Sequence, residues 1–260
     1  DMTTAGGYGV FYGPNLAADG TVAGDGKIAG TEVLAFSDDG DGRRNVVLMV
    51  QIPSTFNPRK ACIVTATSSG SRGIYGAIST GEWGLKQGCA VAYTDKGTGA
   101  GPHDLGADTV ALIDGTRTSA TEAGTTAHFR APLYDSERAT FAATHPGRFA
   151  FKHAHSRHNP ERDWGRHTLQ AIEFAYWVLN ERHGHDIGHG LVLRRIHPVN
   201  TMVIASSISN GGGAAIAAAE LDRQGLIDGV AVSEPAVELP RVDLTVRRGQ
   251  TEQIVNGRTL

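Results

Sequence analysis

The sequence predicts an α/β fold with a mostly parallel sheet that starts with an antiparallel hairpin. From residue 61 onward, short apolar runs typical of buried strands alternate with segments of helical character. Before them, the apolar runs 31–36 and 45–52 flank a turn-forming segment rich in Asp and Gly, which favours a hairpin at a sheet edge. The 260 residues, 40% of them hydrophobic, suffice for one domain of this class.

The first half of the chain predicts two strands around one helix. Residues 1–30 show no sustained period, so we expect an irregular lead-in. Residues 61–67 and 89–94 have the composition of buried strands, and the segment 78–86 between them favours a helix. Residues 97–166 are polar and less periodic, which predicts a long loop excursion over the carboxyl edge of the sheet, with one short strand at 109–113.

The second half predicts a long helix, a central strand and a further helix and strand. Asp163 or a residue beside it can cap a helix that runs to about Arg182. The apolar stripe of this helix comprises Leu169, Ile172, Ala175, Tyr176 and Leu179. Residues 202–205 form an uncharged strand, an alanine-rich helix covers 214–220, and another strand lies within 225–233.

The turn between the central strand and the alanine-rich helix carries the main chemical signal. Its segment Ser207–Gly211 places small residues two positions before and after Ser209, which is a relaxed form of the nucleophile pattern G-x-S-x-G. A serine on such a turn lies at a helix N-terminus, where partial positive charge favours a developing oxyanion. A plain connection and an anion-binding loop are alternatives, although no G-x-x-x-x-G-K-[ST] motif supports phosphate binding.

An acyl-transfer serine also needs two oxyanion donors. Asn210, the residue after Ser209, supplies one amide N–H in this interpretation. The loop Ser68–Ser71 follows an earlier strand, and its small residues would let the backbone approach a tetrahedral intermediate. Ser69 and Gly70 are therefore the candidates for the second donor, and a simple glycine turn is the alternative.

The general base is harder to place. In hydrolases with this turn the chain order is Ser, acid, His, yet no histidine lies between Pro198 and Leu260. We therefore expect the catalytic domain to be incomplete, with its remainder and the catalytic histidine in sequence beyond Leu260. Asp95 and Glu234 follow predicted strands at the edge where sites form, so either could line the pocket, and Glu234 is also a candidate acid.

Composition restricts cofactors and partners. The formal net charge of −3 gives no reason to expect nucleic acid, and no apolar run is long enough to span a membrane. His153, His155 and His158, like the histidines of 183–189, lack the spacing of a defined metal site, so no metal is expected. Two free buried thiols are favoured for Cys62 and Cys89, with a disulfide as the alternative.

Several longer motifs resemble one known family, the bacterial D-3-hydroxybutyrate oligomer hydrolases. The motifs are Thr65–Gly73, Cys89–Gly99, Phe149–His155, Ile204–Gly213 and Gly229–Pro235. The resemblance implies an α/β-hydrolase-like serine esterase, with Ser209 as nucleophile and no cofactor, that cleaves short (R)-3-hydroxybutyrate oligomers to monomers during polyhydroxybutyrate degradation. Members of the family are considerably longer than this chain.

The resemblance leaves two further questions open. An esterase for another short-chain or phenolic ester and a non-catalytic anion-binding module remain alternatives to the oligomer hydrolase. Secretion of some family members suggests a secreted or periplasmic location, with the cytoplasm left open.

Overall fold

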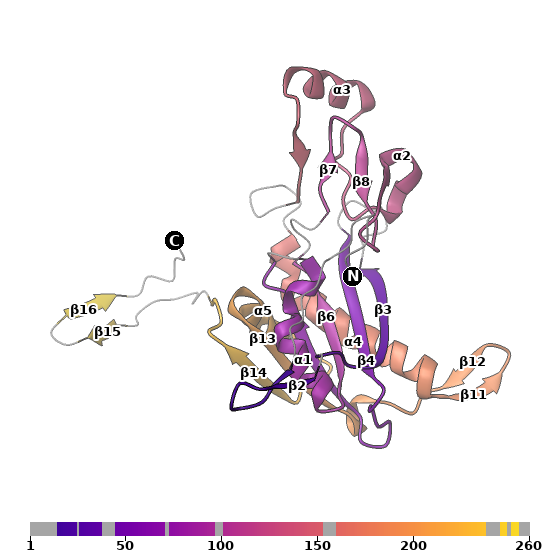
Figure 1. Ribbon diagram of the computed structural model, residues 1–260, viewed down its shortest axis with the longest axis vertical. Coiled ribbons are helices and arrows are strands. Elements are labelled where there is room, and N and C mark those ends of the chain that lie inside the picture. Colours follow the sequence, from indigo (N-terminus) through magenta and orange to yellow (C-terminus); the bar gives the residue numbers. More distant parts are fainter. Residues whose placement is uncertain are drawn as a thin grey trace.

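A six-stranded mixed sheet forms the centre of the protein in the computed structural model (Figure 1). The structure describes residues 15–24, 26–37, 45–70, 73–96, 101–152, 160–237, 245–248 and 251–254. The strand order is β14-β13-β5-β6-β4-β3. These strands are β3 (Gly30–Ser37), β4 (Val46–Pro53), β5 (Cys62–Thr67), β6 (Ala90–Thr94), β13 (Met202–Ile208) and β14 (Gly229–Ser233).

Strand directions confirm the predicted fold class. β14, β13, β5 and β6 run parallel to one another, whereas β4 is antiparallel to both β6 and β3. The predicted hairpin is therefore present, and β3 forms one edge of the sheet. Since the carboxyl ends of the four parallel strands share one edge, the turns that follow β5, β6, β13 and β14 gather there.

Helices cover both faces of the sheet. On one face, α1 (Ile78–Lys86) and the preceding 3-10 turn η1 (Gly73–Ala77) pack over side chains such as Met49 and Val91. On the other face, α4 (Trp164–His183) packs over Val50 and Ile63. α5 (Ser209–Leu221) contacts α4, β13 and β14. Successive side chains of β4 point alternately into the two clusters, and since both faces of the strand are covered, its apolar run is almost unbroken.

The predicted apolar stripe of α4 faces the core. Ile172, Ala175, Tyr176 and Leu179 are buried, and Leu169 is partly buried against the same cluster. Asp163 occupies the predicted N-cap position, but its side chain makes no capping hydrogen bond. Its carboxylate instead pairs with Arg162 at 3.1 Å.

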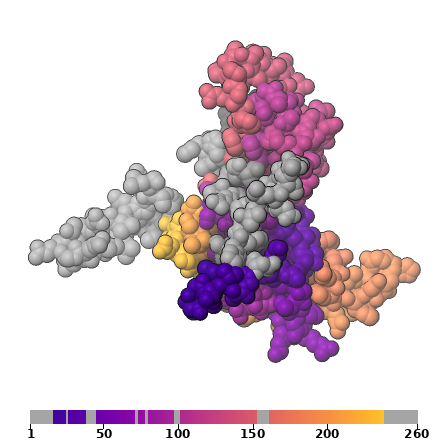
Figure 2. Space-filling view, viewed as in Figure 1, coloured from indigo at the N-terminus to yellow at the C-terminus, as the bar shows by residue number. Residues whose placement is uncertain are grey.

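Residues 101–152 form a small folded subdomain rather than the predicted loop excursion. Its four-stranded sheet has the order β10-β7-β8-β9 and is accompanied by two helices. It rises from the main sheet at the top of Figures 1 and 2, in magenta and pink, and its Thr125 and Ala127 carbonyl oxygens accept from Asn45 Nδ2 beside β4. The elements are β7 (His103–Asp104), β8 (Thr109–Ala111), β9 (Arg117–Ser119), α2 (Ala120–Ala123), the 3-10 turn η2 (Gly124–Thr126), α3 (Asp135–Thr144) and β10 (Phe149–Ala150).

The subdomain has two small apolar clusters of its own, one that includes Val110 and Ala120 and another that includes Phe129. Only β8 was predicted, as the strand at 109–113. Strands of two or three residues are too short to show an alternating pattern, so the sequence of this region appears irregular although it is folded.

Short elements fill most of the remaining described segments. The lead-in contains β1 (Asn15–Leu16) and β2 (Val22–Gly24), and residues 1–14 lie outside the described part of the chain. The others are η3 (Pro160–Asp163), β11 (His185–Gly188), β12 (Leu191–Leu193), η4 (Pro198–Asn200), β15 (Thr245–Arg248) and β16 (Thr251–Ile254). The hairpin β11–β12 projects beyond the C-terminal end of α4 (Figure 1).

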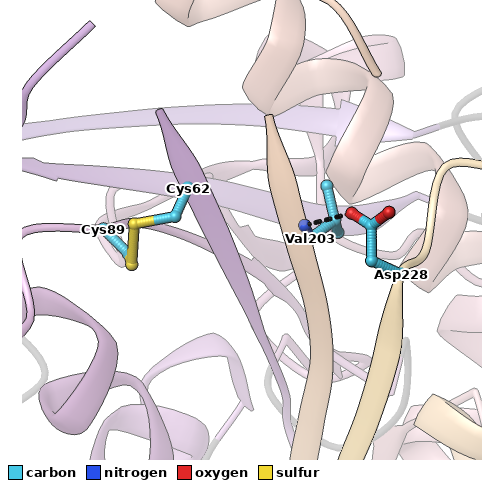
Figure 3. The surroundings of a disulfide bond; sticks show 4 residues. All are labelled: Cys62, Cys89, Val203 and Asp228. Carbon is cyan, nitrogen blue, oxygen red and sulfur yellow. Dashed lines mark hydrogen bonds between the residues drawn. A yellow bond between two sulfur atoms is a disulfide. The ribbon is translucent and has the colours of Figure 1, made fainter. Parts of the chain in front are cut away.

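Cys62 and Cys89 form a disulfide, so the prediction of two free thiols is wrong. Cys62 begins β5, and Cys89 immediately precedes β6, whose Ala90 pairs with Ile63. This register places the two Cα atoms 4.8 Å apart, within the range that a disulfide spans (Figure 3). On the next strand, Val203 donates its N–H to the Asp228 carboxylate at 2.8 Å.

None of the helices in the described ranges combines the length and the apolar character that crossing a membrane requires.

Candidate active site

Ser209 occupies a sharp turn between the central strand and the following helix. β13 ends at Ile208 and α5 begins at Ser209, five residues earlier than the helix predicted from the alanine-rich segment. Ser209 is exposed and has a φ of +57°, in the left-handed region that a residue with a side chain rarely adopts. Such strained positions concentrate at functional sites, and a nucleophile turn has this geometry.

The glycines after Ser209 allow three segments to meet at the turn. A Cβ atom on Gly211 would collide with the Thr67 carbonyl oxygen and with Ser207 Oγ. A Cβ atom on Gly213 would collide with the carbonyl oxygen of Ala236, which follows β14. The N–H of Ala236 also donates to the carbonyl oxygen of Ser209 at 3.0 Å. The small residues therefore let the ends of β5 and β14 approach the start of α5.

The loop after β5, residues 68–70, lies beside Ser209. Ser69 Oγ donates to the carbonyl oxygen of Ile208 at 2.7 Å and accepts from the N–H of Gly211 at 3.4 Å. Gly70 has a φ of +104°, and its N–H donates to Ser68 Oγ at 3.0 Å. The structure thus brings the 68–70 loop and the Ser209 turn together, as the oxyanion-hole hypothesis requires.

The predicted oxyanion donors differ in whether their N–H groups already have an acceptor. Asn210 is the second residue of α5, so its N–H has no acceptor within the helix. Since the Gly70 N–H is engaged by Ser68 Oγ, Ser69 is the better candidate for the second donor. Both candidates lie close to the positive end of the α5 dipole.

Asp95 and Glu234 both follow strands at the carboxyl edge of the sheet, as predicted. Asp95, after β6, is 2% exposed, and its N–H donates to the Val47 carbonyl oxygen at 3.0 Å. Glu234, after β14, is exposed and has a φ of +46°. Because Glu234 lies two residues before Ala236, it belongs to the segment that hydrogen-bonds Ser209. Neither carboxylate is among the hydrogen-bonding partners of Ser209 in the described part of the chain.

Lys96 is a component of the site that the sequence did not reveal. Its side chain covers Gly70, and its ammonium group pairs with Glu161 at 2.8 Å. The same nitrogen lies 5.2 Å from the centre of the Trp164 ring, within the range of a cation–π interaction. Lys96 therefore joins the 68–70 loop to the start of α4, and only the tertiary fold brings these segments together.

The histidines provide no base for Ser209 within the described ranges. His153, His155 and His158 lie in the segment 153–159, outside the described residues. His183 lies beside the ring of Phe56, and burial lowers the pKa of its imidazole. No described histidine hydrogen-bonds Ser209, and the described residues contain no group of three His, Cys, Asp or Glu side chains suited to a metal ion.

Comparison with known proteins identifies close relatives along the whole chain. The family model for 3HB-oligomer hydrolase matches residues 1–260. The D-(-)-3-hydroxybutyrate oligomer hydrolase of Paracidovorax citrulli is 65% identical over 259 residues, which cover 99% of this chain and 36% of that protein. The protein of the same name from Ralstonia pickettii is 60% identical over 100% of this chain and 35% of its own length. The chain therefore spans little more than a third of the length of these curated relatives.

Two solved structures show a weaker likeness. A dienelactone hydrolase-like phosphotriesterase from metagenomic libraries has a TM-score of 0.39 and 10% identity, over 82% of this chain and 63% of its own. Brefeldin A esterase has a TM-score of 0.36 and 15% identity, over 78% of this chain and 39% of its own.

Proposed function

The chain belongs to the 3HB-oligomer hydrolase family, and we propose that it is the nucleophile-bearing part of a serine esterase. Its substrates are short oligomers of (R)-3-hydroxybutyrate, which it hydrolyses to monomers during degradation of polyhydroxybutyrate. The observation that carries the proposal is the strained Ser209 between β13 and α5, beside the 68–70 loop, in a chain of this family. No cofactor takes part in the reaction.

Ser209 acts as the nucleophile in this mechanism. Its Oγ attacks the ester carbonyl carbon while a general base takes the hydroxyl proton. The N–H groups of Asn210 and Ser69 donate to the resulting oxyanion, whose charge the N-terminus of α5 also favours. The C–O bond to the leaving hydroxyl group then breaks, and that group takes the proton from the base. Water, activated by the same base, hydrolyses the acyl-enzyme to release a carboxylate and restore Ser209.

The general base is a histidine outside the 260 residues, and the rest of the protein therefore completes the site. The relatives have further sequence in which such a histidine could lie, since the chain covers only 36% of the Paracidovorax citrulli protein. Glu234 is a candidate for the acid that orients the histidine, because its segment hydrogen-bonds the backbone of Ser209. We expect the 260-residue chain alone to show little or no turnover.

The enzyme functions outside the cytoplasm, in the periplasm or after secretion. The disulfide between Cys62 and Cys89 supports this location, because disulfides persist in oxidising compartments and are rare in the cytoplasm. Fractionation of the native organism, followed by thiol labelling of the isolated protein, would test it. A cytoplasmic protein with two free thiols would contradict the proposal.

Hydrolysis of defined oligomers by the full-length protein tests the function. Dimers and trimers of (R)-3-hydroxybutyrate should yield monomer with a higher kcat/KM than p-nitrophenyl or phenolic esters. Ser209→Ala should abolish monomer release, whereas Ser136→Ala, at an exposed position of α3, should leave it unchanged. A preference for the aryl esters would instead support a general carboxylesterase, and retained activity in Ser209→Ala would refute the nucleophile assignment.

A further inference from the structure

Side-chain hydroxyls replace the backbone ladder between β5 and β13 near the site. Backbone pairing between the two strands ends at Ile204 and Val64. Beyond that point, Thr65 Oγ1 accepts the N–H of Ser206 at 2.9 Å and donates to the carbonyl oxygen of the same residue at 3.1 Å. The strands therefore separate toward their carboxyl ends, while hydroxyl groups keep them in register.

The series continues with Ser207 and Ser69. Ser207 Oγ donates to the carbonyl oxygen of Thr67. One step further, Ser69 Oγ donates to the Ile208 carbonyl oxygen at 2.7 Å and accepts the Gly211 N–H at 3.4 Å. These two backbone groups belong to residues on either side of Ser209. The single hydroxyl of Ser69 thus contacts the turn both before and after the proposed nucleophile.

Ser69 also supplies a helix cap that α5 lacks in its own sequence. The N-cap residue of α5 is Ile208, whose apolar side chain makes no capping hydrogen bond. The first N–H groups of a helix have no acceptor within it, and a capping side chain normally accepts from one of them. Ser69 Oγ performs this role for Gly211 from the loop that follows β5.

We propose that Ser69 is a positioning residue, whose hydroxyl group holds the 68–70 loop at a set distance from Ser209. This inference rests on the proposed function and adds a role for the Ser69 side chain to that of its backbone N–H. An oxyanion donor must lie within about 3 Å of the oxygen that becomes charged, so a small shift of the loop weakens it. By tying its own side chain to the turn, Ser69 fixes the position of its own amide relative to the nucleophile.

Ser69→Ala in the full-length protein distinguishes the contribution of the side chain from that of the backbone, since alanine keeps the N–H and removes only the hydroxyl. We expect kcat, measured per active site titrated with a fluorophosphonate, to fall about tenfold to a hundredfold, with KM changed less than about twofold. Ser69→Thr keeps a hydroxyl and should recover most of kcat. Ser54→Ala, an exposed serine after β4, is the matched control and should behave as wild type.

Hydrogen exchange gives a readout that does not depend on activity. The Gly211 amide should exchange faster in Ser69→Ala than in wild type and should regain protection in Ser69→Thr. Unchanged kcat and unchanged Gly211 exchange in Ser69→Ala would overturn the inference, and so would a loss that appears only as a smaller folded fraction. Failure of the proposed function would be distinct, because the wild type would then release no monomer from the oligomers or Ser209→Ala would retain that activity.

Discussion

Lys96 lies directly against Gly70, so the loop beside the proposed nucleophile is held by two separate contacts. A Cβ atom on Gly70 would collide with Lys96 Cδ and lie 3.3 Å from Lys96 Cβ. The neighbouring residue Ser69 is tied to the Ile208 carbonyl oxygen. The Lys96 ammonium is in turn fixed by Glu161 at 2.8 Å. Such double support would keep an oxyanion donor in place before the substrate binds.

Gly70→Ala should destabilise the protein by about 1–3 kcal/mol, because alanine is strained at positive φ and would also collide with Lys96. The cost should be smaller when Lys96 is also replaced by alanine, since the collision is then relieved. Urea unfolding of the two single variants and the double variant measures this coupling. The control is Gly147→Ala, at a φ of +70° with no atom within 4 Å, which reports backbone strain alone. Purely additive costs for Gly70 and Lys96 would contradict the described contact.

The disulfide should contribute about 3–4 kcal/mol to the free energy of unfolding. Cys62 and Cys89 are separated by 27 residues, and this magnitude follows from the chain-entropy model for a loop of that length. Replacing both cysteines with serine should lower the midpoint of urea unfolding, and adding reductant to the wild type should have a similar effect. Alkylation of two thiols in the native, unreduced protein would show that the bond is absent.

The free energy of unfolding should fall in weak acid because of the buried His128. Burial, with a contribution from the charge of Lys152, lowers the pKa of His128 to about 4 from an ordinary value of 6.5. Between these values the unfolded chain binds a proton that the folded protein does not, so stability decreases as pH falls from about 6.5 to about 4. The loss is up to about 1.4 kcal/mol per pH unit and about 3 kcal/mol in total.

His128→Phe should reduce this acid-dependent loss, as measured by urea unfolding at a series of pH values. The aromatic contact with Phe36 can persist, because phenylalanine has a similar shape to histidine. His167 and His183, whose pKa values burial also lowers, should retain a smaller slope in the variant. The control is His145→Phe, at an exposed position of the same subdomain. A slope identical to that of wild type in His128→Phe would contradict the assignment.

Asn180 should be costly to replace, because its buried amide uses both its donor and its acceptor. Its Nδ2 donates to the carbonyl oxygens of Tyr176 and Ile196, and its Oδ1 accepts the N–H groups of Arg195 and Ile196. Asn180→Ala would leave these groups unpaired, and we expect a loss of about 2–4 kcal/mol in thermal or urea unfolding. Asn57→Ala, at an exposed turn, should cost far less. Equal effects of the two variants would show that the network adds little.

The sequence predicted those parts of the fold whose pattern is local. The apolar runs of β4, β5 and β13 are long enough to identify buried strands, and small residues around Ser209 indicated the turn. The disulfide was beyond local inference, because it depends on the register between β5 and β6. The subdomain of residues 101–152 was missed because its strands contain only two or three residues.

The contacts that hold the 68–70 loop in place were harder to predict than the serine nucleophile. Hydroxyl groups of Thr65, Ser69 and Ser207, around the ends of β5 and β13, are a signal that hydrogen bonding continues where the backbone pairing stops. The hydroxyl of Thr67 instead pairs with that of Thr168 in α4. No sequence pattern signals the contact between Lys96 and Gly70, since it depends on where the residues after β6 lie relative to those after β5.

Covalent labelling shows whether Ser209 is the nucleophile. The full-length protein is treated with a fluorophosphonate, digested and mapped by mass spectrometry, with Ser209→Ala as the control. We predict a single modified site at Ser209, loss of oligomer hydrolysis in proportion to labelling, and no modification of the control variant. An active protein whose Ser209 stays unmodified, or whose label lies on another serine, would refute the assignment of Ser209 as the nucleophile.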